Sequence, residues 1–358
     1  MLGRATDLTR AGKLLDATAA IQRALGDTQP SRTRKPVRGE DSRQPLDGDF
    51  RVVAPTQARA SQSRRKSAPA GDASGGFSAG TYAAQSGTRH YKLFVPAGLG
   101  DKRLPLLVML HGCKQDPDDF AAGTRMNLLA QELGVIVLYP AQAPRSNAYK
   151  CWNWFQPGDQ RRGAGEPALL AAMTRHIMET QAVDADRVYI AGLSAGGAMA
   201  AIMGREYADL YAAVGVHSGL APGAAHDVSS AFSVMNNGAP GKTPRGAASI
   251  AGSRTAPIIV FHGDRDSTVH ADNGAHVVGA RAAASARHDK GDAAGRTYTR
   301  SRFKPADGHA PAEHWVIHGA GHAWSGGSSD GSYTDAQGPD ASREMLRFFL
   351  EHPHRSRA

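Results

Sequence analysis

The feature that most constrains this chain is a turn near its middle, where a strand-like run passes a serine and continues as a helix-like run. Residues 187–191 are mostly β-branched, aromatic or small, whereas residues 195–206 are rich in alanine and methionine. Between them, Gly192-Leu193-Ser194-Ala195-Gly196 fits the pattern Gly-x-Ser-x-Gly. In a strand-to-helix elbow, glycine two residues either side of the serine lets strand and helix approach without a Cβ clash. The pattern predicts an exposed Ser194 at a strand's carboxyl end; a plain turn in a chain of 41 glycines is the alternative.

Three regions follow one another along the chain. Residues 5–26 predict an amphipathic helix within a first segment, 1–26, because Leu14, Ala17, Ile21 and Leu25 share one face. Residues 27–80 are rich in Arg, Ser, Pro and Gly and predict a flexible linker. The first 80 residues hold 14 Lys and Arg against 8 Asp and Glu, so most of the formal charge of +9 lies there. Residues 81–355 remain for a catalytic domain.

This last region alternates strand-like and helix-like runs, which predicts an α/β fold with a mainly parallel twisted sheet and helices on both faces. Residues 220–256 interrupt the alternation and are expected to lie over the strand ends as a lid or pocket wall. The expected strands span residues 90–95, 104–110, 135–139, 187–190, 212–216, 257–262 and 313–317, and the expected helices span 118–133, 166–181, 195–206, 275–287 and 339–352.

Several classes of function find no support in the sequence. The first 80 residues have no apolar run longer than three, so neither an export signal nor a membrane span is expected. Arg64-Arg65-Lys66 lacks interleaved aromatic residues, so no nucleic-acid partner is expected. The chain holds 15 histidines but no His-Glu-x-x-His pattern and no phosphate-loop or dinucleotide fingerprint, so neither a metal nor a cofactor is expected.

An acidic loop and a histidine loop follow later strands, so the chain supplies Ser, Asp and His in the order found in α/β-hydrolases. A serine becomes a nucleophile when an imidazole accepts its proton and a carboxylate orients that imidazole. Of the carboxylates after residues 257–261 we select Asp266, with Asp264 as the alternative. Of the histidines after residues 313–317 we select His322, because His318 is expected to pack at the strand end.

The same chemistry needs two backbone donors for the negative oxygen of the tetrahedral intermediate. One is the N–H of Ala195, directly after the serine. The other is expected in the loop after residues 104–110, from Cys113, with Gly112 as the alternative. The chain's two cysteines, Cys113 and Cys151, form either one bridge or two buried thiols on this reading.

Five sequence pieces together resemble a known family, the α/β-hydrolase esterases related to polyhydroxybutyrate depolymerases, which also include feruloyl and acetylxylan esterases. The pieces span roughly residues 82–350 and read Leu110-His111-Gly112-Cys113-Lys114-Gln115, Cys151-Trp152-Asn153-Trp154-Phe155, Gly192-Leu193-Ser194-Ala195-Gly196-Gly197, His262-Gly263-Asp264-Arg265-Asp266 and Gly321-His322-Ala323-Trp324-Ser325-Gly326-Gly327.

The resemblance implies an α/β-hydrolase fold with Ser194, Asp266 and His322 as a catalytic triad. It also implies Cys113 with Ala195 as the oxyanion pair and a Cys113–Cys151 disulfide. The family works outside the cell as a rule, so an extracellular location is implied, with a cytoplasmic one as the alternative because no export signal is visible. Trp324 and Trp152 are the expected substrate contacts; Trp154 and Phe155 are weaker candidates.

The expected function is hydrolysis of carboxylic esters through an acyl-enzyme. The substrate implied is polyhydroxybutyrate or a related hydroxyalkanoate ester, oligomeric or polymeric, and a feruloyl or acetylxylan ester is the alternative. Two other readings stay open: a serine peptidase with the same three side chains, and a non-catalytic protein whose extension coats polymer granules or another surface.

Overall fold

The computed structural model describes residues 75–84, 87–100, 102–238, 255–279, 286–304 and 310–354. The chain divides into two units after Asp72, and the described residues all belong to the second unit, Ala73–Ala358. The helix expected at residues 5–26 and most of the linker expected at 27–80 therefore lie outside the described residues.

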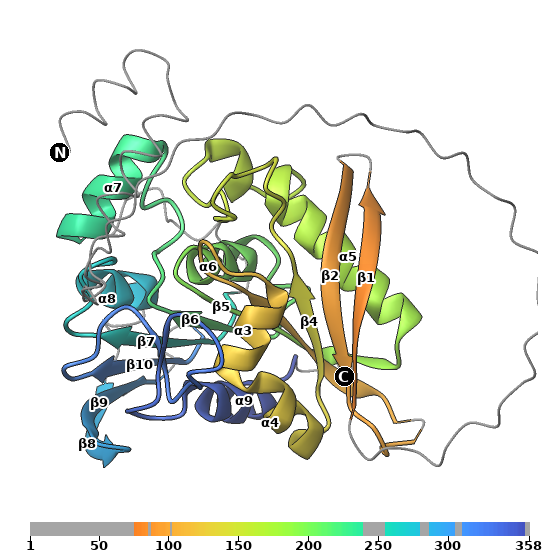
Figure 1. Ribbon diagram of the computed structural model, residues 1–358. Coiled ribbons are helices and arrows are strands. Elements are labelled where there is room, and N and C mark those ends of the chain that lie inside the picture. The colour runs from red at the N-terminus through yellow and green to blue at the C-terminus, as the bar shows by residue number, and fades with distance from the viewer. Residues whose placement is uncertain are drawn as a thin grey trace, which may run out of the picture. The chain divides into compact units, whose positions relative to one another are not determined.

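Ten strands of the described residues form one sheet, in the order β1-β2-β4-β3-β5-β6-β7-β10-β9-β8 (Figure 1). Its six central strands, from β4 to β10, run parallel, and an antiparallel pair flanks them on each side. The strands are β1 (Gly76–Ala84), β2 (Gly87–Val95), β3 (Leu104–Leu110), β4 (Ile136–Pro140), β5 (Val183–Leu193), β6 (Ala213–His217), β7 (Ile258–Gly263), β8 (Ala286–Ala293), β9 (Arg296–Phe303) and β10 (Ala312–Ile317), with a separate short pair, β11 (Trp324–Ser325) and β12 (Thr334–Asp335).

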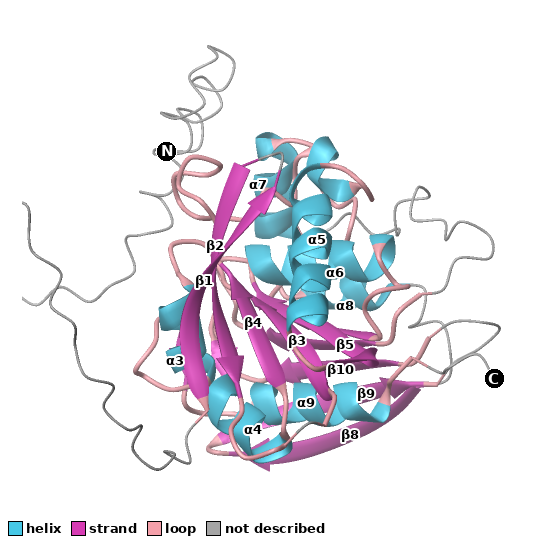
Figure 2. Cartoon of the chain, turned by 90° about the vertical axis from the view of Figure 1, so that its right-hand side faces the viewer, coloured by secondary structure: helices cyan, strands magenta, loops and turns pink. Residues whose placement is uncertain are grey.

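Helices cover both faces of the sheet, with α3, α4 and α9 on one side and α5, α6 and α8 on the other (Figure 2). This arrangement is the α/β-hydrolase architecture that the sequence predicted. The helices are α3 (Pro117–Thr124), α4 (Met126–Leu133), α5 (Gly165–Thr180), α6 (Ala195–Glu206), α7 (Val228–Asn237), α8 (Asp272–Val278) and α9 (Ala341–Glu351), with a 3-10 turn η1 (Pro157–Gln160).

The two layers of core follow from the two-residue period of a strand. In β3, Leu106 and Val108 pack into the layer beneath α5 and α6, whereas Leu107 and Met109 pack into the layer beneath α4 and α9. Because the central strands have helices on both sides, side chains that point to either face of the sheet enter an apolar layer. Strand β3 is therefore buried throughout apart from its first residue. A strand of this kind has no polar face, which is why its sequence reads as an uninterrupted apolar run.

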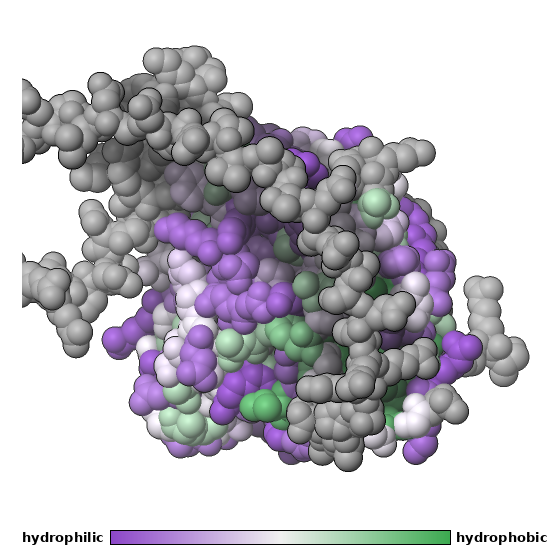
Figure 3. All heavy atoms as spheres, turned by 45° about the vertical axis from the view of Figure 1, so that its right-hand side comes forward, coloured by the Kyte–Doolittle hydropathy of each residue, from purple (hydrophilic) through white to green (hydrophobic). Residues whose placement is uncertain are grey.

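The first described strand overlaps the segment expected to be linker. Strand β1 starts at Gly76, inside the segment expected to be linker up to residue 80, and pairs with β2 from Gly76↔Val95 onward. Exposed and half-buried residues alternate along much of β1, and the half-buried Phe77 and Tyr82 pack against the core. Figure 3 views this side of the molecule and shows hydrophilic and hydrophobic residues interspersed on it.

Two helix predictions differ from the structure. The helix expected at residues 118–133 is two helices, because Arg125 takes a left-handed conformation (φ 53°) and its side chain donates to the Gly326 carbonyl oxygen at 2.7 Å. The helix expected at 275–287 is wrong at its carboxyl end. There α8 ends before Gly279 (φ 59°), and Arg287 lies in β8, which forms a hairpin with β9.

The segment expected to act as a lid, residues 220–256, contains a helix that the sequence reading did not predict. Asp227 caps α7 by accepting a hydrogen bond from the Ser230 N–H at 2.7 Å, and the Ser230 hydroxyl accepts one in return from the Asp227 N–H. This reciprocal capping box starts a helix in a sequence poor in other helix signals. Residues 239–254 lie outside the described residues. In the described part of the chain, no helix is long and apolar enough to cross a membrane.

Candidate active site

Ser194 occupies a strained elbow between β5 and α6. Its backbone has φ 57° and ψ −119°, a conformation uncommon for a residue other than glycine. A Cβ at Gly196 would overlap the Leu110 carbonyl oxygen, and one at Gly192 would overlap the Gly196 backbone. The two glycines therefore let α6 start against β3 and β5, as the Gly-x-Ser-x-Gly pattern predicted.

The register of the sheet brings the three candidate loops to one edge. Leu193 pairs with His217, His217 pairs with Phe261, and Gly263 pairs with Ile317, so β5, β6, β7 and β10 end almost level. Ser194 follows β5, Asp266 lies three residues beyond β7, and His322 lies five residues beyond β10. Carboxyl ends of parallel strands are where open α/β sheets hold their ligands.

Asp266 and His322 form a buried pair. The His322 Nδ1 lies 2.7 Å from the Asp266 Oδ2, and the two side chains are 9% and 0% exposed. The other carboxylate oxygen accepts hydrogen bonds from the N–H groups of Thr268 and Val269, at 2.9 and 2.8 Å. Burial alone would raise the pKa of Asp266, but the hydrogen bonds from His262 and His322 and their charges outweigh burial and hold that pKa below its ordinary value. Asp266 is thus a carboxylate that orients the His322 ring.

This orientation leaves Nε2 of His322 as the nitrogen that can accept a proton. In the described residues, no hydrogen bond joins the Ser194 hydroxyl to the His322 ring. Catalytic hydrogen bonds in ligand-free hydrolases are often long and shorten when substrate binds. The arrangement can therefore perform general-base chemistry on a hydroxyl placed between the two loops.

Asp264 and His318, the alternatives to Asp266 and His322, pair with each other instead. The Asp264 Oδ2 lies 2.9 Å from His318 Nδ1, and the Thr299 hydroxyl lies 2.9 Å from His318 Nε2. The Asp264 and His318 side chains are 36% and 40% exposed, so the expectation that His318 is packed is wrong. The structure favours Asp266, because Asp266 is the carboxylate that contacts His322.

The loop after β3 distinguishes the two candidates for the second oxyanion donor. The Gly112 N–H donates to the Gln115 Oε1 at 2.9 Å and is therefore occupied. In the described residues the N–H of Cys113 has no acceptor, and the N–H of Ala195, as the first residue of α6, has none within the helix. Cys113 and Ala195 thus keep N–H donors without an acceptor in the described residues, whereas Gly112 does not.

A disulfide joins Cys113 to Cys151. It closes a segment of 38 residues, which by loop entropy stabilises the fold by roughly 4 kcal/mol. The Trp152 indole N–H donates to the His111 carbonyl oxygen at 3.1 Å and adds a second link beside the bridge. The loop that carries Cys113 is therefore held from the side of residues 151 and 152.

A known protein family matches this chain. Residues 89–300 match the model described as esterase PHB depolymerase, and this match covers more than half of the chain. The chain belongs to the esterase PHB depolymerase family.

This chain is similar to known proteins of three kinds: a depolymerase, a feruloyl esterase and a probable acetylxylan esterase. It is 35% identical over 182 residues to poly(3-hydroxyalkanoate) depolymerase C of Paucimonas lemoignei, covering 49% of this chain and 43% of that protein. It is 34% identical over 129 residues to feruloyl esterase B of Neurospora crassa, covering 36% and 43%. It is 30% identical over 200 residues to a probable acetylxylan esterase A of Neosartorya fischeri, covering 52% and 53%. The chain spans about half the length of these relatives.

A solved structure supports the fold of this family member. The acetyl xylan esterase from Aspergillus awamori superposes with a TM-score of 0.60 at 21% identity, covering 76% of this chain and 99% of that one. The α/β-hydrolase fold is therefore shared.

The two tryptophans expected to contact substrate in this esterase-family chain are buried. Trp324 and Trp152 are each 1% exposed. The Trp324 indole N–H donates to the Ser342 hydroxyl at 3.0 Å, and its ring stacks on His217. Both rings are core residues beneath the site, so the prediction that they contact substrate is wrong. Trp324 lies two residues beyond His322, but this closeness in the sequence did not show that the Trp324 ring points into the core.

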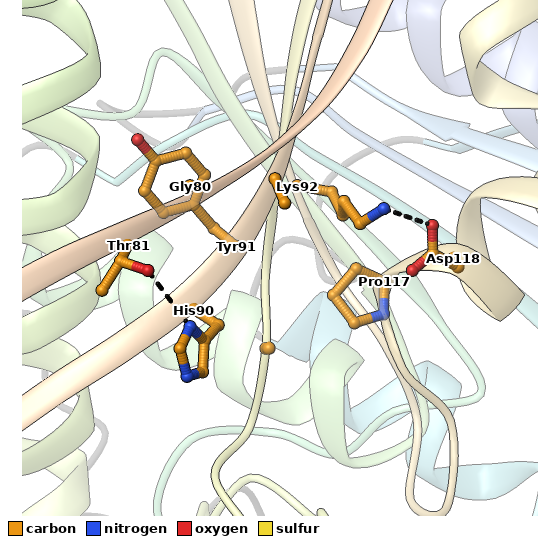
Figure 4. Close-up of a pocket in the computed structure, with 9 residues that line it drawn as sticks. Gly80, Thr81, His90, Tyr91, Lys92, Pro117 and Asp118 are labelled. Carbon is orange, nitrogen blue, oxygen red and sulfur yellow. Dashed lines mark hydrogen bonds and ion pairs between the residues drawn. The ribbon is translucent and has the colours of Figure 1, made fainter. Parts of the chain in front are cut away.

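A surface pocket of about 290 Å³ lies where the β1–β2 hairpin meets the start of α3 (Figure 4). Lys92 and Asp118 form an ion pair of 2.9 Å across it, and Thr81 Oγ1 lies 3.2 Å from His90 Nδ1. The residues that line it are Ala79, Gly80, Thr81, His90, Tyr91, Lys92, Pro117, Asp118 and Ala141. None of them is a candidate catalytic residue. The described residues also contain no group of three or more His, Cys, Asp or Glu side chains that could hold a metal ion.

The sequence reading missed a buried carboxyl group, Glu166, in the first turn of α5. Glu166 is 4% exposed and accepts hydrogen bonds from the Asn153 N–H at 2.8 Å, the Asn153 side-chain amide at 2.9 Å and the Gln142 side-chain amide. Gln142 also donates to the Cys151 carbonyl oxygen at 2.9 Å. Glu166 therefore anchors the segment that carries the disulfide. A glutamate in a helix's first turn gave no signal, because exposed glutamates are common there.

Glu166 is expected to make stability depend on pH. Burial raises its pKa to about 7, from an ordinary value of 4.5. Between these values the folded state keeps a proton that the unfolded state releases, so stability is greatest below the unfolded pKa and falls as pH rises to the folded one. Glu166→Gln removes this titration. The free energy of unfolding of the Glu166→Gln variant, relative to that of the unsubstituted chain, should therefore rise by about 2–3 kcal/mol from pH 5 to pH 8.

Denaturant unfolding at both pH values measures this difference. Glu179→Gln, on the exposed side of the same helix, is the matched control for loss of a surface carboxylate. An unchanged stability difference between the Glu166→Gln variant and the unsubstituted chain at pH 5 and pH 8 would contradict the assignment.

Proposed function

We propose that this protein hydrolyses carboxylic esters through an acyl-enzyme. Ser194 Oγ bonds to the ester carbonyl carbon while His322 takes its proton, and Asp266 stabilises the resulting imidazolium. The alcohol leaves with the proton from His322. Water then attacks the acyl group, His322 again serves as base, and the free acid and Ser194 are regenerated. The observation that carries the proposal is the buried Asp266–His322 pair at the sheet edge that also holds the Ser194 elbow.

The negative oxygen that forms in both steps needs hydrogen-bond donors. The N–H groups of Cys113 and Ala195 supply them in this proposal. Loss of one such donor typically slows turnover about 100-fold to 1000-fold. The disulfide and the Trp152 contact support this role, because they hold the Cys113 loop in place before substrate arrives.

The substrate we propose is polyhydroxybutyrate or a related hydroxyalkanoate ester, in oligomeric or polymeric form. Membership of the esterase PHB depolymerase family and the 35% identity to poly(3-hydroxyalkanoate) depolymerase C support this choice. A feruloyl or acetylxylan ester is the second candidate, favoured by the similarity to feruloyl esterase B and to the probable acetylxylan esterase A. The same three side chains could serve a peptidase, but the family membership favours esters.

We also propose that the protein works outside the cell. The Cys113–Cys151 disulfide supports this, because disulfides persist in oxidising surroundings and are rare in the cytosol. The alternative is a cytoplasmic location.

A substrate panel tests the proposed function. The purified chain is incubated with hydroxybutyrate trimer, polyhydroxybutyrate film, methyl ferulate, acetylated xylan and a peptide p-nitroanilide, and released acid or amine is quantified. We expect release from the trimer to exceed release from the ferulate and acetyl esters. Preferential hydrolysis of ferulate or acetylated xylan supports the second candidate. Hydrolysis of the anilide alone, or no hydrolysis at all, contradicts an ester hydrolase.

A further inference from the structure

Tyr333 is an aromatic residue at a position where neither the core nor the backbone conformation calls for one. It is 41% exposed, and among the large hydrophobic residues of the described part of the chain Leu128 alone is more exposed. Its backbone lies in the left-handed region, with φ 53°. That conformation is rare for a bulky side chain, whereas glycine adopts it without strain. Neither burial nor local backbone preference therefore explains a tyrosine at this position.

The Tyr333 backbone is tied to the loop that carries His322. Its carbonyl oxygen accepts a hydrogen bond from the Trp324 N–H at 2.7 Å, and Trp324 lies two residues beyond His322. The next residue, Thr334, pairs with Trp324 in the short parallel pair β11–β12. The buried Trp324 ring thus serves as a fixed base beneath the loop that presents Tyr333.

A second set of contacts ties the neighbouring residue to the oxyanion loop. The Gln115 side-chain amide donates to the Ser332 carbonyl oxygen at 3.0 Å, and its Oε1 accepts from the Gly112 N–H at 2.9 Å. A Cβ placed on Gly112 would lie 3.6 Å from the Ser194 Cβ. Ser332 also donates to Asp119 through both its N–H and its hydroxyl, at 2.8 and 2.6 Å. Residues 332 and 333 therefore bridge the oxyanion loop and the His322 loop.

We propose that Tyr333 is a substrate-contact residue at the rim of the Ser194 site, where its ring packs against the apolar chain of an extended ester. This inference rests on the proposed function. A strained, exposed aromatic residue held between two catalytic loops is what a binding role requires, since strain of this kind persists where the surroundings impose it. The ring takes the place of the two buried tryptophans as the aromatic contact. Because the ring lies at the rim, it should favour substrates with several linked units over a short acetyl ester.

Two variants of Tyr333 and one control test the proposal. Tyr333→Ala removes the ring, and Tyr333→Gly removes the ring while suiting the left-handed backbone. Leu128→Ala removes an apolar side chain that is 69% exposed on α4 and is the matched control. For each protein, kcat/KM is measured on hydroxybutyrate trimer and on p-nitrophenyl acetate, and the trimer-to-acetate ratio is compared.

We expect the trimer-to-acetate ratio to fall about tenfold in both Tyr333 variants, through a higher KM for the trimer, and to stay unchanged in the control. A loss confined to Tyr333→Ala, with a normal ratio in Tyr333→Gly, overturns the proposal, because it assigns the effect to backbone strain. A normal ratio in both variants also overturns it and leaves the proposed function intact. If the unsubstituted chain hydrolyses neither substrate, the proposed function fails, and this inference fails with it.

Discussion

Replacing Ser194 by alanine is expected to lower kcat for ester hydrolysis about 10⁶-fold. The hydroxyl is the nucleophile in the proposed mechanism, and removal of a catalytic serine from a comparable triad has an effect of this size. The fold should survive, because a short side chain replaces another at the elbow and the glycines that allow the close packing of α6 remain. Initial rates on p-nitrophenyl acetate measure the loss.

The neighbouring Ser218, buried after β6, is the matched control for loss of a serine hydroxyl at this edge. Its hydroxyl lies 3.2 Å from Nδ1 of His217, a histidine whose pKa burial lowers to about 3 and which is therefore neutral. Ser218→Ala should keep a rate within about tenfold of the unsubstituted chain, since it has no role in bond formation. Equal rates for Ser194→Ala and the unsubstituted chain would remove the basis of the mechanism.

Replacing Asp266 by asparagine is expected to lower kcat about 10⁴-fold. Asparagine keeps the size of the side chain, but it cannot stabilise an imidazolium and it can hold the His322 ring in the wrong tautomer. Stability should also fall, because the carboxylate accepts hydrogen bonds from two backbone N–H groups and from His322. Thermal unfolding of the same samples separates a folding defect from a catalytic one.

Asp264→Asn is the control for this prediction, since Asp264 pairs with His318 at the exposed side of the same loop. We expect it to retain activity within a few-fold. The reverse outcome, with Asp264→Asn inactive and Asp266→Asn active, would assign the role of the acid to Asp264 and would contradict the geometry described above.

Features set by local sequence were predictable. Gly192 and Gly196 are needed because backbone atoms occupy the space where their Cβ atoms would lie, and this requirement is visible as a pattern around Ser194. The helix expected at 195–206 matches α6 residue for residue. The parallel strands end almost level, so the loops that follow them lie at one edge of the sheet. The convergence of the serine, aspartate and histidine loops could therefore be predicted from the strands that precede them.

Features set by tertiary packing were not predictable. Trp324 lies two residues beyond His322, but its ring turns into the core to stack on His217, and nothing in the local sequence records that direction. The hairpin of β8 and β9 turns at Ala294 and Gly295, both with positive φ, without the Asn-Gly signal usual for such a turn. The Gly112 N–H donates to the Gln115 side chain, a contact that the sequence did not predict, although Cys113 was already preferred to Gly112 as the expected donor.

Covalent labelling tests the central claim most directly. The unsubstituted chain and Ser194→Ala are treated with a p-nitrophenyl phosphonate, and intact mass is followed by peptide mapping. A serine activated by the Asp266–His322 pair should gain one phosphonyl group on Ser194, and the alanine variant should gain none. Equal labelling of the two proteins, a phosphonyl group mapped to another residue, or an unlabelled chain that still hydrolyses esters would contradict the account.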